Sequence, residues 1–81
     1  MFGKQKRIVN KELIETYQSM KCAACRAWQN VSAHHIKSRG SGGHDIPENL
    51  IPLCIRCHIE IHQIGNRKFI EIYPHTKKYL T

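Results

Sequence analysis

Apolar residues recur with a helical period near the start of the chain. Four of them fall at intervals of one or three residues: Leu13, Ile14, Tyr17 and Met20. This spacing predicts an amphipathic helix whose apolar side packs toward the core. Asn10 precedes the pattern and is a preferred N-cap residue, because its side-chain oxygen accepts a hydrogen bond from the first helical turn.

Short apolar runs farther along the chain predict two strands and then a second helix. The strands are expected over residues 31–36 and 50–53, separated by a loop that includes residues 37–45, three of which are glycines. We expect this loop to be mobile. The second helix is predicted to start near Cys54 and to end near Gly65, because glycine suits a helix C-terminus, and a further helix follows it. These elements indicate a small α+β fold.

Four cysteines form two Cys-x-x-Cys pairs, Cys22 with Cys25 and Cys54 with Cys57. This is the spacing of zinc half-sites, and a chain of 81 residues needs such a staple because its core is small. A structural zinc ion on four thiolates is therefore predicted. A redox pair and two disulfides are the alternatives, and a redox role leaves one pair unexplained.

The start of the chain and the length of its apolar runs indicate where in the cell the protein is expected. The basic start of the chain is not followed by the apolar stretch of a signal peptide, and no run approaches the roughly 18 apolar residues of a membrane span. We expect a soluble, cytoplasmic protein without a membrane partner, in which thiols stay reduced and free to bind metal.

The chain is strongly basic, with 13 Lys and Arg against 6 Asp and Glu. This excess favours binding to a polyanion, most simply nucleic acid, over an uninvolved basic surface. Residues 1–9 form a basic arm. Lys37 and Arg39 in the glycine-rich loop are candidate phosphate contacts. Charge alone does not distinguish DNA from RNA.

Four histidines are spaced to meet at one place. His34 and His35 are neighbours on a strand, so their side chains face opposite sides, whereas His58 and His62 lie one turn apart on a helix. One of the strand histidines can complete a three-nitrogen metal site with the helix pair, and the other is left free to act on water. Cys57 and His58 point about 100° apart on that helix, so it can serve two different metals. This division of roles suits metal-assisted hydrolysis of a phosphodiester.

Three segments together resemble a known family. They are His-His-Ile-Lys-Ser-Arg-Gly at 34–40, Asn-Leu-Ile-Pro-Leu-Cys at 49–54, and Cys-His at 57–58. They are similar to the HNH endonucleases, and in particular to the branch whose ββα-metal core is braced by four zinc-binding cysteines. The resemblance implies a single nuclease domain over residues 1–81, with the zinc-braced core at 22–62 and flanking helices.

The resemblance also implies roles for individual residues. His34 and His58 become ligands of a catalytic divalent cation, and His62 matches a third histidine ligand found in the colicin-type nucleases. His35 becomes the general base that activates the attacking water. Asn49 becomes the loop residue whose hydrogen bonds hold the base strand in place.

The implied activity is metal-dependent cleavage of DNA to 5′-phosphate and 3′-hydroxyl ends. Lys37, Arg39 or Arg56 would stabilise the charge at phosphorus. The working ion can be Mg²⁺, Mn²⁺, Ni²⁺ or Zn²⁺. A monomer with one centre would nick, while a homodimer could cut both strands, and the small size favours low specificity or a specificity-giving protein partner. The alternative is a zinc-stapled nucleic-acid-binding module that does not cut, which leaves the histidines without a purpose.

Overall fold

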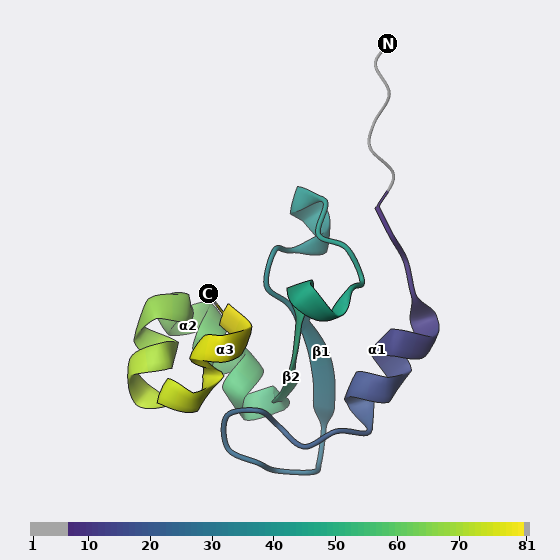
Figure 1. Cartoon of the computed structure of the whole chain (residues 1–81). Coiled ribbons are helices and arrows are strands. Elements are labelled where there is room, and N and C mark those ends of the chain that lie inside the picture. The colour runs from purple at the N-terminus through teal and green to yellow at the C-terminus, as the bar shows by residue number, and fades with distance from the viewer. Residues whose placement is uncertain (1–6, 81) are drawn as a thin grey trace.

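The computed structural model describes residues 7–80 and has two strands, three helices and three short 3₁₀ turns (Figure 1). The elements in chain order are α1 (Lys11–Gln18), β1 (Val31–His35), the turns Arg39–Ser41 and Pro47–Asn49, β2 (Leu50–Cys54), α2 (Ile55–Ile72), the turn Pro74–Thr76, and α3 (Lys77–Leu80). The predicted α+β class is confirmed. Within this described part of the chain, no helix combines the length and the apolar character that crossing a membrane requires.

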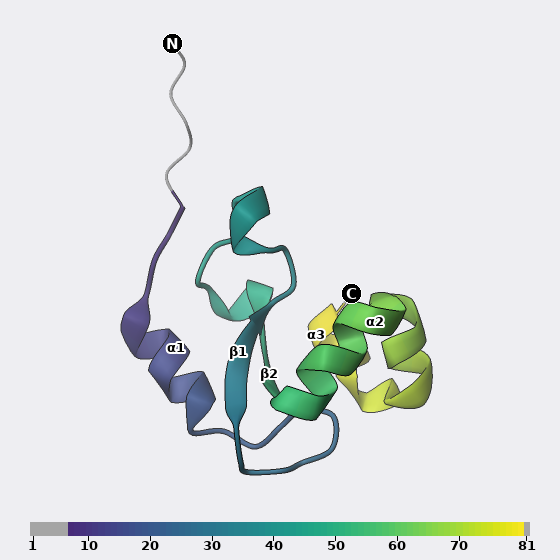
Figure 2. The same cartoon turned by 180° about the vertical axis from the view of Figure 1, so that it is seen from behind.

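The two strands pair antiparallel and form the centre of the molecule. His34 lies opposite Ile51, and Ala33 lies opposite Pro52. Because side chains alternate along a strand, the first pair faces one side of the sheet and the second pair faces the other. Both views place α1 on one side of the strands and α2 with α3 on the other (Figure 1 and Figure 2).

The core is built around β2, every residue of which is buried. Leu50, Ile51 and Leu53 have no exposed surface, and neither does Phe69 from the second half of α2. A strand that is covered on both faces reads as a continuous apolar run and not as an alternating one. The thiol of Cys54, at the end of this strand, belongs to the same cluster of buried side chains.

Helix α1 begins where the sequence predicts. The Asn10 side chain accepts a hydrogen bond from the Leu13 backbone N–H at 3.0 Å. Tyr17 is buried, but the predicted apolar side is shorter than expected. The helix ends at Gln18, so Met20 lies beyond it and is exposed.

The backbone leaves the helical conformation at Gly65, as predicted, with φ 83° and ψ 165°. Only glycine adopts this conformation without strain, so the residue sets the angle between the two halves of α2. The loop after β1 contains regular structure that the sequence does not predict. It has a 3₁₀ turn whose N-cap, Ser38, accepts a hydrogen bond from the Ser41 N–H.

Gly43 permits the loop to close on itself. A Cβ atom at this position would lie 1.8 Å from the Lys37 carbonyl oxygen and 2.9 Å from Asn49 Nδ2. A Cβ atom on Gly40, in the same loop, would meet no heavy atom within 4 Å. The two glycines therefore differ in what they contribute to the fold.

We expect Gly43→Ala to lower the free energy of unfolding by about 1–3 kcal/mol, because the loop backbone must shift to relieve the overlap. Gly40→Ala is the matched control and should change it by less than about 0.5 kcal/mol. Urea unfolding of the zinc-loaded protein measures both values. Equal stability of the two variants would contradict the close approach at Gly43.

Candidate metal centres and active site

The four cysteine thiols converge where β2 meets α2. Their Sγ atoms all lie within 4.8 Å of one another, and those of Cys25 and Cys54 are 3.5 Å apart. Tetrahedral zinc, with Zn–S bonds of about 2.3 Å, holds its sulfur ligands about 3.8 Å apart. The cluster therefore has the donor set and the spacing for structural zinc. The connection between α1 and β1 passes beneath the strands and brings Cys22 and Cys25 to this point (Figure 1).

Backbone N–H groups favour the thiolate form within this cluster. Burial raises the pKa of the Cys22 thiol, but hydrogen bonds from the N–H groups of Cys25, Cys54 and Ala24 outweigh it and bring the pKa to about 7. Burial and the neighbouring thiols raise the pKa of Cys57. Four thiols this close cannot all ionise alone, so a bound cation is what makes the fully ionised cluster stable.

Two further residues lie near the first cysteine pair. The side chain of Trp28 is 65% exposed, with Lys21 Nζ 5.0 Å from the ring centroid. His75 Nε2 donates a hydrogen bond to the Ala24 carbonyl oxygen at 2.9 Å, so the C-terminal segment is tied to the cysteine loop.

A second cluster combines one histidine from β1 with two from α2. The nitrogens of His34, His58 and His62 lie within 4.8 Å of one another, and His58 Nε2 is 3.2 Å from His62 Nε2. Two nitrogen ligands on one tetrahedral ion, at metal–nitrogen distances of about 2.0–2.1 Å, would be about 3.3 Å apart. The geometry thus fits a single divalent cation. Cys57, adjacent to His58, is turned toward the thiols.

Two of these imidazoles, His34 and His58, are held in the form that binds metal. Burial, together with the smaller effects of the charges of His58, His62 and His35, lowers the pKa of His34 to about 4. Burial and the proximity of His62 also lower the pKa of His58. A metal ligand must be neutral imidazole, so His34 and His58 need not lose a proton before binding a cation at neutral pH.

His35 faces away from this cluster and contacts a carboxylate. Its Nε2 lies 2.6 Å from Asp45 Oδ1, and its side chain is only 9% exposed. Asp45 also accepts hydrogen bonds from Arg7 Nη1 and from the Asn10 backbone N–H, both at 2.9 Å. Burial alone would raise the pKa of Asp45, but the hydrogen bonds from His35, Asn10 and Arg7 outweigh it and lower the pKa to about 2. The carboxylate is therefore ionised at neutral pH.

Neither Asp45 nor its contact with His35 follows from the spacing arguments. The sequence did hold one signal for the role of this residue: Asp45 is the sole aspartate of the chain, and it lies at the end of the glycine-rich loop, shortly before Asn49. Arg7, in the predicted basic arm, forms an ion pair with Asp45, while residues 1–6 lie outside the described part of the chain.

Asn49 holds both ends of the loop that follows β1. Its Oδ1 accepts from the Lys37 N–H at 2.7 Å, and its Nδ2 donates to the carbonyl oxygens of Lys37 and His44 at 3.1 and 3.0 Å. The Asn49 carbonyl also extends the strand pairing by accepting from the Ile36 N–H. The side chain therefore positions the end of the strand that carries His35, without contacting the imidazole through any of these bonds.

The three predicted phosphate contacts fall at different places. Lys37 is exposed directly after β1. Arg39 lines a pocket of about 370 Å³ together with Arg7 and Asp45, so it lies on the His35 side of the loop. Arg56 lines a pocket together with Cys25 and Cys57.

His44 is half-buried and has a structural contact. Its Nδ1 accepts a hydrogen bond from the Ile8 backbone N–H at 2.8 Å, so it anchors the segment before α1. The Asp45 N–H donates to the Ile8 carbonyl oxygen at 2.9 Å. Together these bonds hold residues 7–10 along the loop that carries Asp45.

Comparison with protein families places this geometry in a known class. The family described as HNH endonuclease matches residues 22–63, just over half of the chain and a span that includes both clusters. The chain therefore belongs to the HNH endonuclease family. Comparisons with curated proteins and with solved structures find no further match.

We expect Cys25→Ser to lose zinc and to unfold cooperatively at or below room temperature, because structural zinc contributes on the order of 10 kcal/mol to folding in small zinc domains. His62→Ala is the matched control, since it removes a ligand of the other cluster and should keep the fold and one zinc ion. Elemental analysis and circular dichroism measure both properties. Cys25→Ser that melts like the wild type would contradict a structural role for the thiolate site.

Proposed function

We propose that this protein is a metal-dependent DNA endonuclease that hydrolyses phosphodiester bonds and leaves 5′-phosphate and 3′-hydroxyl ends. The observation that carries the proposal is the convergence of His34 from β1 with His58 and His62 from α2, within reach of one cation. Membership of the HNH family supports the same activity.

The histidine cluster would hold the catalytic cation through His34 and His58, with His62 as the third ligand. A bound divalent cation supplies positive charge to a non-bridging phosphate oxygen and to the leaving oxygen. His34 is a buried residue of β1 and His58 lies in the first turn of α2, so the protein orients both ligands before metal binds. Such preorganisation is what a catalytic centre requires.

His35 is the proposed general base. Asp45 is ionised and only accepts hydrogen bonds, so Nε2 of His35 carries the proton that lies between them. The Nδ1 atom of the neutral ring then has a free lone pair, and it is the atom that takes a proton from the attacking water. Asp45 fixes this tautomer and stabilises the imidazolium that forms after proton transfer.

Asn49 and the loop cations complete the proposed site. Asn49 holds the end of β1 against the loop through hydrogen bonds to the backbone. We therefore propose that it positions His35 and does not contact the phosphate. Lys37 and Arg39 are proposed as backbone phosphate contacts, since both lie in or beside this loop. Arg56, which lines a pocket together with Cys25 and Cys57, is proposed as a further contact with DNA.

We expect His35→Ala to lower the rate of plasmid cleavage by about 10²–10⁴-fold, the usual contribution of a general base. The variant should keep its fold, its zinc and its affinity for DNA, because His35 is neither a zinc ligand nor a phosphate contact. A supercoiled-plasmid assay with added Mg²⁺ or Mn²⁺ measures the rate. Equal cleavage by both proteins would exclude His35, and no cleavage by either with any divalent cation would favour a binding module that does not cut.

We expect Asp45→Asn to lower kcat at least about tenfold with little change in KM, because the neutral amide no longer fixes the imidazole tautomer or stabilises the imidazolium. Glu48→Gln is the matched control, since Glu48 is an exposed carboxylate in the same connection, and it should cleave within about twofold of wild type. Steady-state kinetics on a short duplex separate the two constants. Loss of binding alone, with kcat retained, would show that Asp45 has no part in the chemistry.

A further inference from the structure

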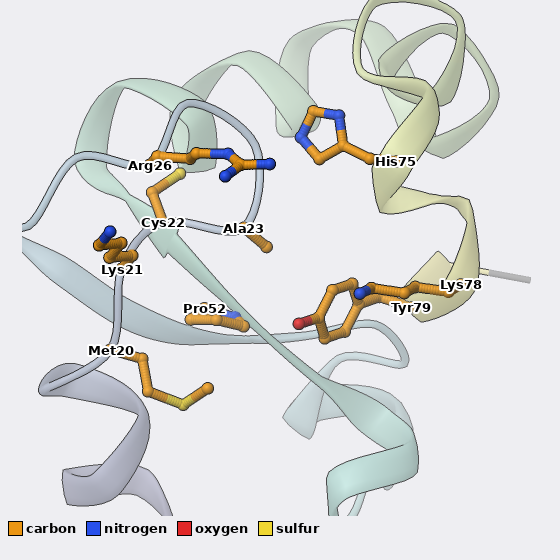
Figure 3. A pocket seen from close by; sticks show the side chains of 9 residues that line it. All are labelled: Met20, Lys21, Cys22, Ala23, Arg26, Pro52, His75, Lys78 and Tyr79. Carbon is orange, nitrogen blue, oxygen red and sulfur yellow. The ribbon is translucent and has the colours of Figure 1, made fainter.

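A pocket of about 300 Å³ lies between the cysteine loop and the C-terminal segment (Figure 3). It is lined by Met20, Lys21, Cys22, Ala23, Arg26, Pro52, His75, Lys78 and Tyr79. Three of these side chains are Lys or Arg, a fourth is His, and none is acidic. Figure 3 shows Arg26 on the cysteine loop and His75 across from it on the C-terminal segment, with Pro52 and Tyr79 below them.

This pocket is separate from the histidine cluster. Pro52 pairs with Ala33, whereas its neighbour Ile51 pairs with His34, so the two pairs face opposite sides of the sheet. The side chain of Pro52 lines the pocket, while that of His34 contacts His58 on the other face. None of the residues proposed for the cleavage chemistry lines this pocket.

No carboxylate of the described residues forms an ion pair with Lys21, Arg26 or Lys78. Cations near Cys22 also offset the charge of a thiolate zinc site. That explanation covers Arg26, whose backbone N–H donates to the Cys22 carbonyl oxygen, better than Lys78, which comes from α3 and has its Nζ 5.5 Å from the Tyr79 ring centroid.

An exposed aromatic side chain adjoins the pocket. Lys21 Nζ lies 5.0 Å from the centroid of the Trp28 ring, so this lysine links the pocket to the indole. Trp28 is 65% exposed, although burying its large apolar ring would stabilise the fold. A groove of positive charge next to an exposed aromatic ring is the combination by which proteins hold single-stranded nucleic acid, with phosphates on the cations and a base on the ring.

We propose that this pocket binds a phosphate of single-stranded nucleic acid and that an adjacent unpaired base stacks on Trp28. The bases of a duplex are already stacked on one another, so a free indole face selects an unpaired strand. Binding at this pocket does not need the histidine cluster, and it extends beyond the proposed cleavage activity. It would give the protein a second contact with a substrate that contains an unpaired region.

Trp28 is the sole tryptophan, so its fluorescence reports stacking directly. The titration uses zinc-loaded His35→Ala protein, which prevents cleavage, and an oligothymidylate of about 15 nucleotides, within the range of single-strand site sizes. We expect the oligonucleotide to quench the fluorescence. In about 0.1 M salt, Lys78→Ala should weaken binding about fivefold and lower the slope of log K against log salt by about 0.7, the effect of one lost phosphate contact.

Lys68→Ala is the matched control, because Lys68 is an exposed lysine of α2 that does not line the pocket. It should bind within about twofold of the parent, and Lys78→Arg should restore the affinity. The same zinc content and circular dichroism in every variant would exclude a folding effect. Anisotropy of a labelled oligonucleotide should show weaker binding by Trp28→Leu.

Three outcomes would overturn the proposal. They are no quenching by the oligonucleotide, equal weakening by Lys78→Ala and Lys68→Ala, and equal quenching by a duplex of the same length. None of them affects the plasmid assay with His35→Ala, so this proposal and the proposed nuclease activity fail independently of each other.

Discussion

The convergence of four thiols at the end of β2 is the constraint on which the rest of the structure depends. Cys54 ends the strand and Cys57 lies in the first turn of α2, so one cluster sets the direction in which the helix leaves the sheet. The pair from the connection before β1 closes the cluster from below. A chain this short has little apolar area with which to fix that direction. The distance from His34 to His58, and with it the proposed active site, therefore follows from the thiolate site.

Two adjacent residues of α2, Cys57 and His58, belong to different clusters of metal-binding side chains. A rotation of about 100° along the helix turns the first toward a buried sulfur cluster and the second toward β1. The thiolate site is closed by four protein ligands, as structural zinc sites are, whereas three nitrogens leave room for water or phosphate. One helical turn thus contributes to a cluster suited to structural zinc and to a cluster proposed to hold a catalytic cation.

A second set of contacts controls the other histidine. Asp45 joins the base candidate His35 to Arg7 and Asn10, so the segment before α1 is held against the loop that follows β1. Asn49 holds the two ends of the same loop. A buried carboxylate with three hydrogen-bond donors is rigid and remains charged, which suits a group that orients an imidazole. The proposed base is therefore positioned by residues that are remote from one another in sequence.

The sequence by itself determined the features that depend on residues close together in the chain. They are the Cys-x-x-Cys pairs, the histidines four residues apart, the Asn10 cap and the break at Gly65. The tertiary structure decided which histidine joins the helix pair, how far Trp28 is exposed, and the partners of Asp45. His35 and Asp45 are 10 residues apart, while Arg7 and Asp45 are 38 apart. Contacts of this kind depend on how the chain returns to itself, and no local period encodes that path.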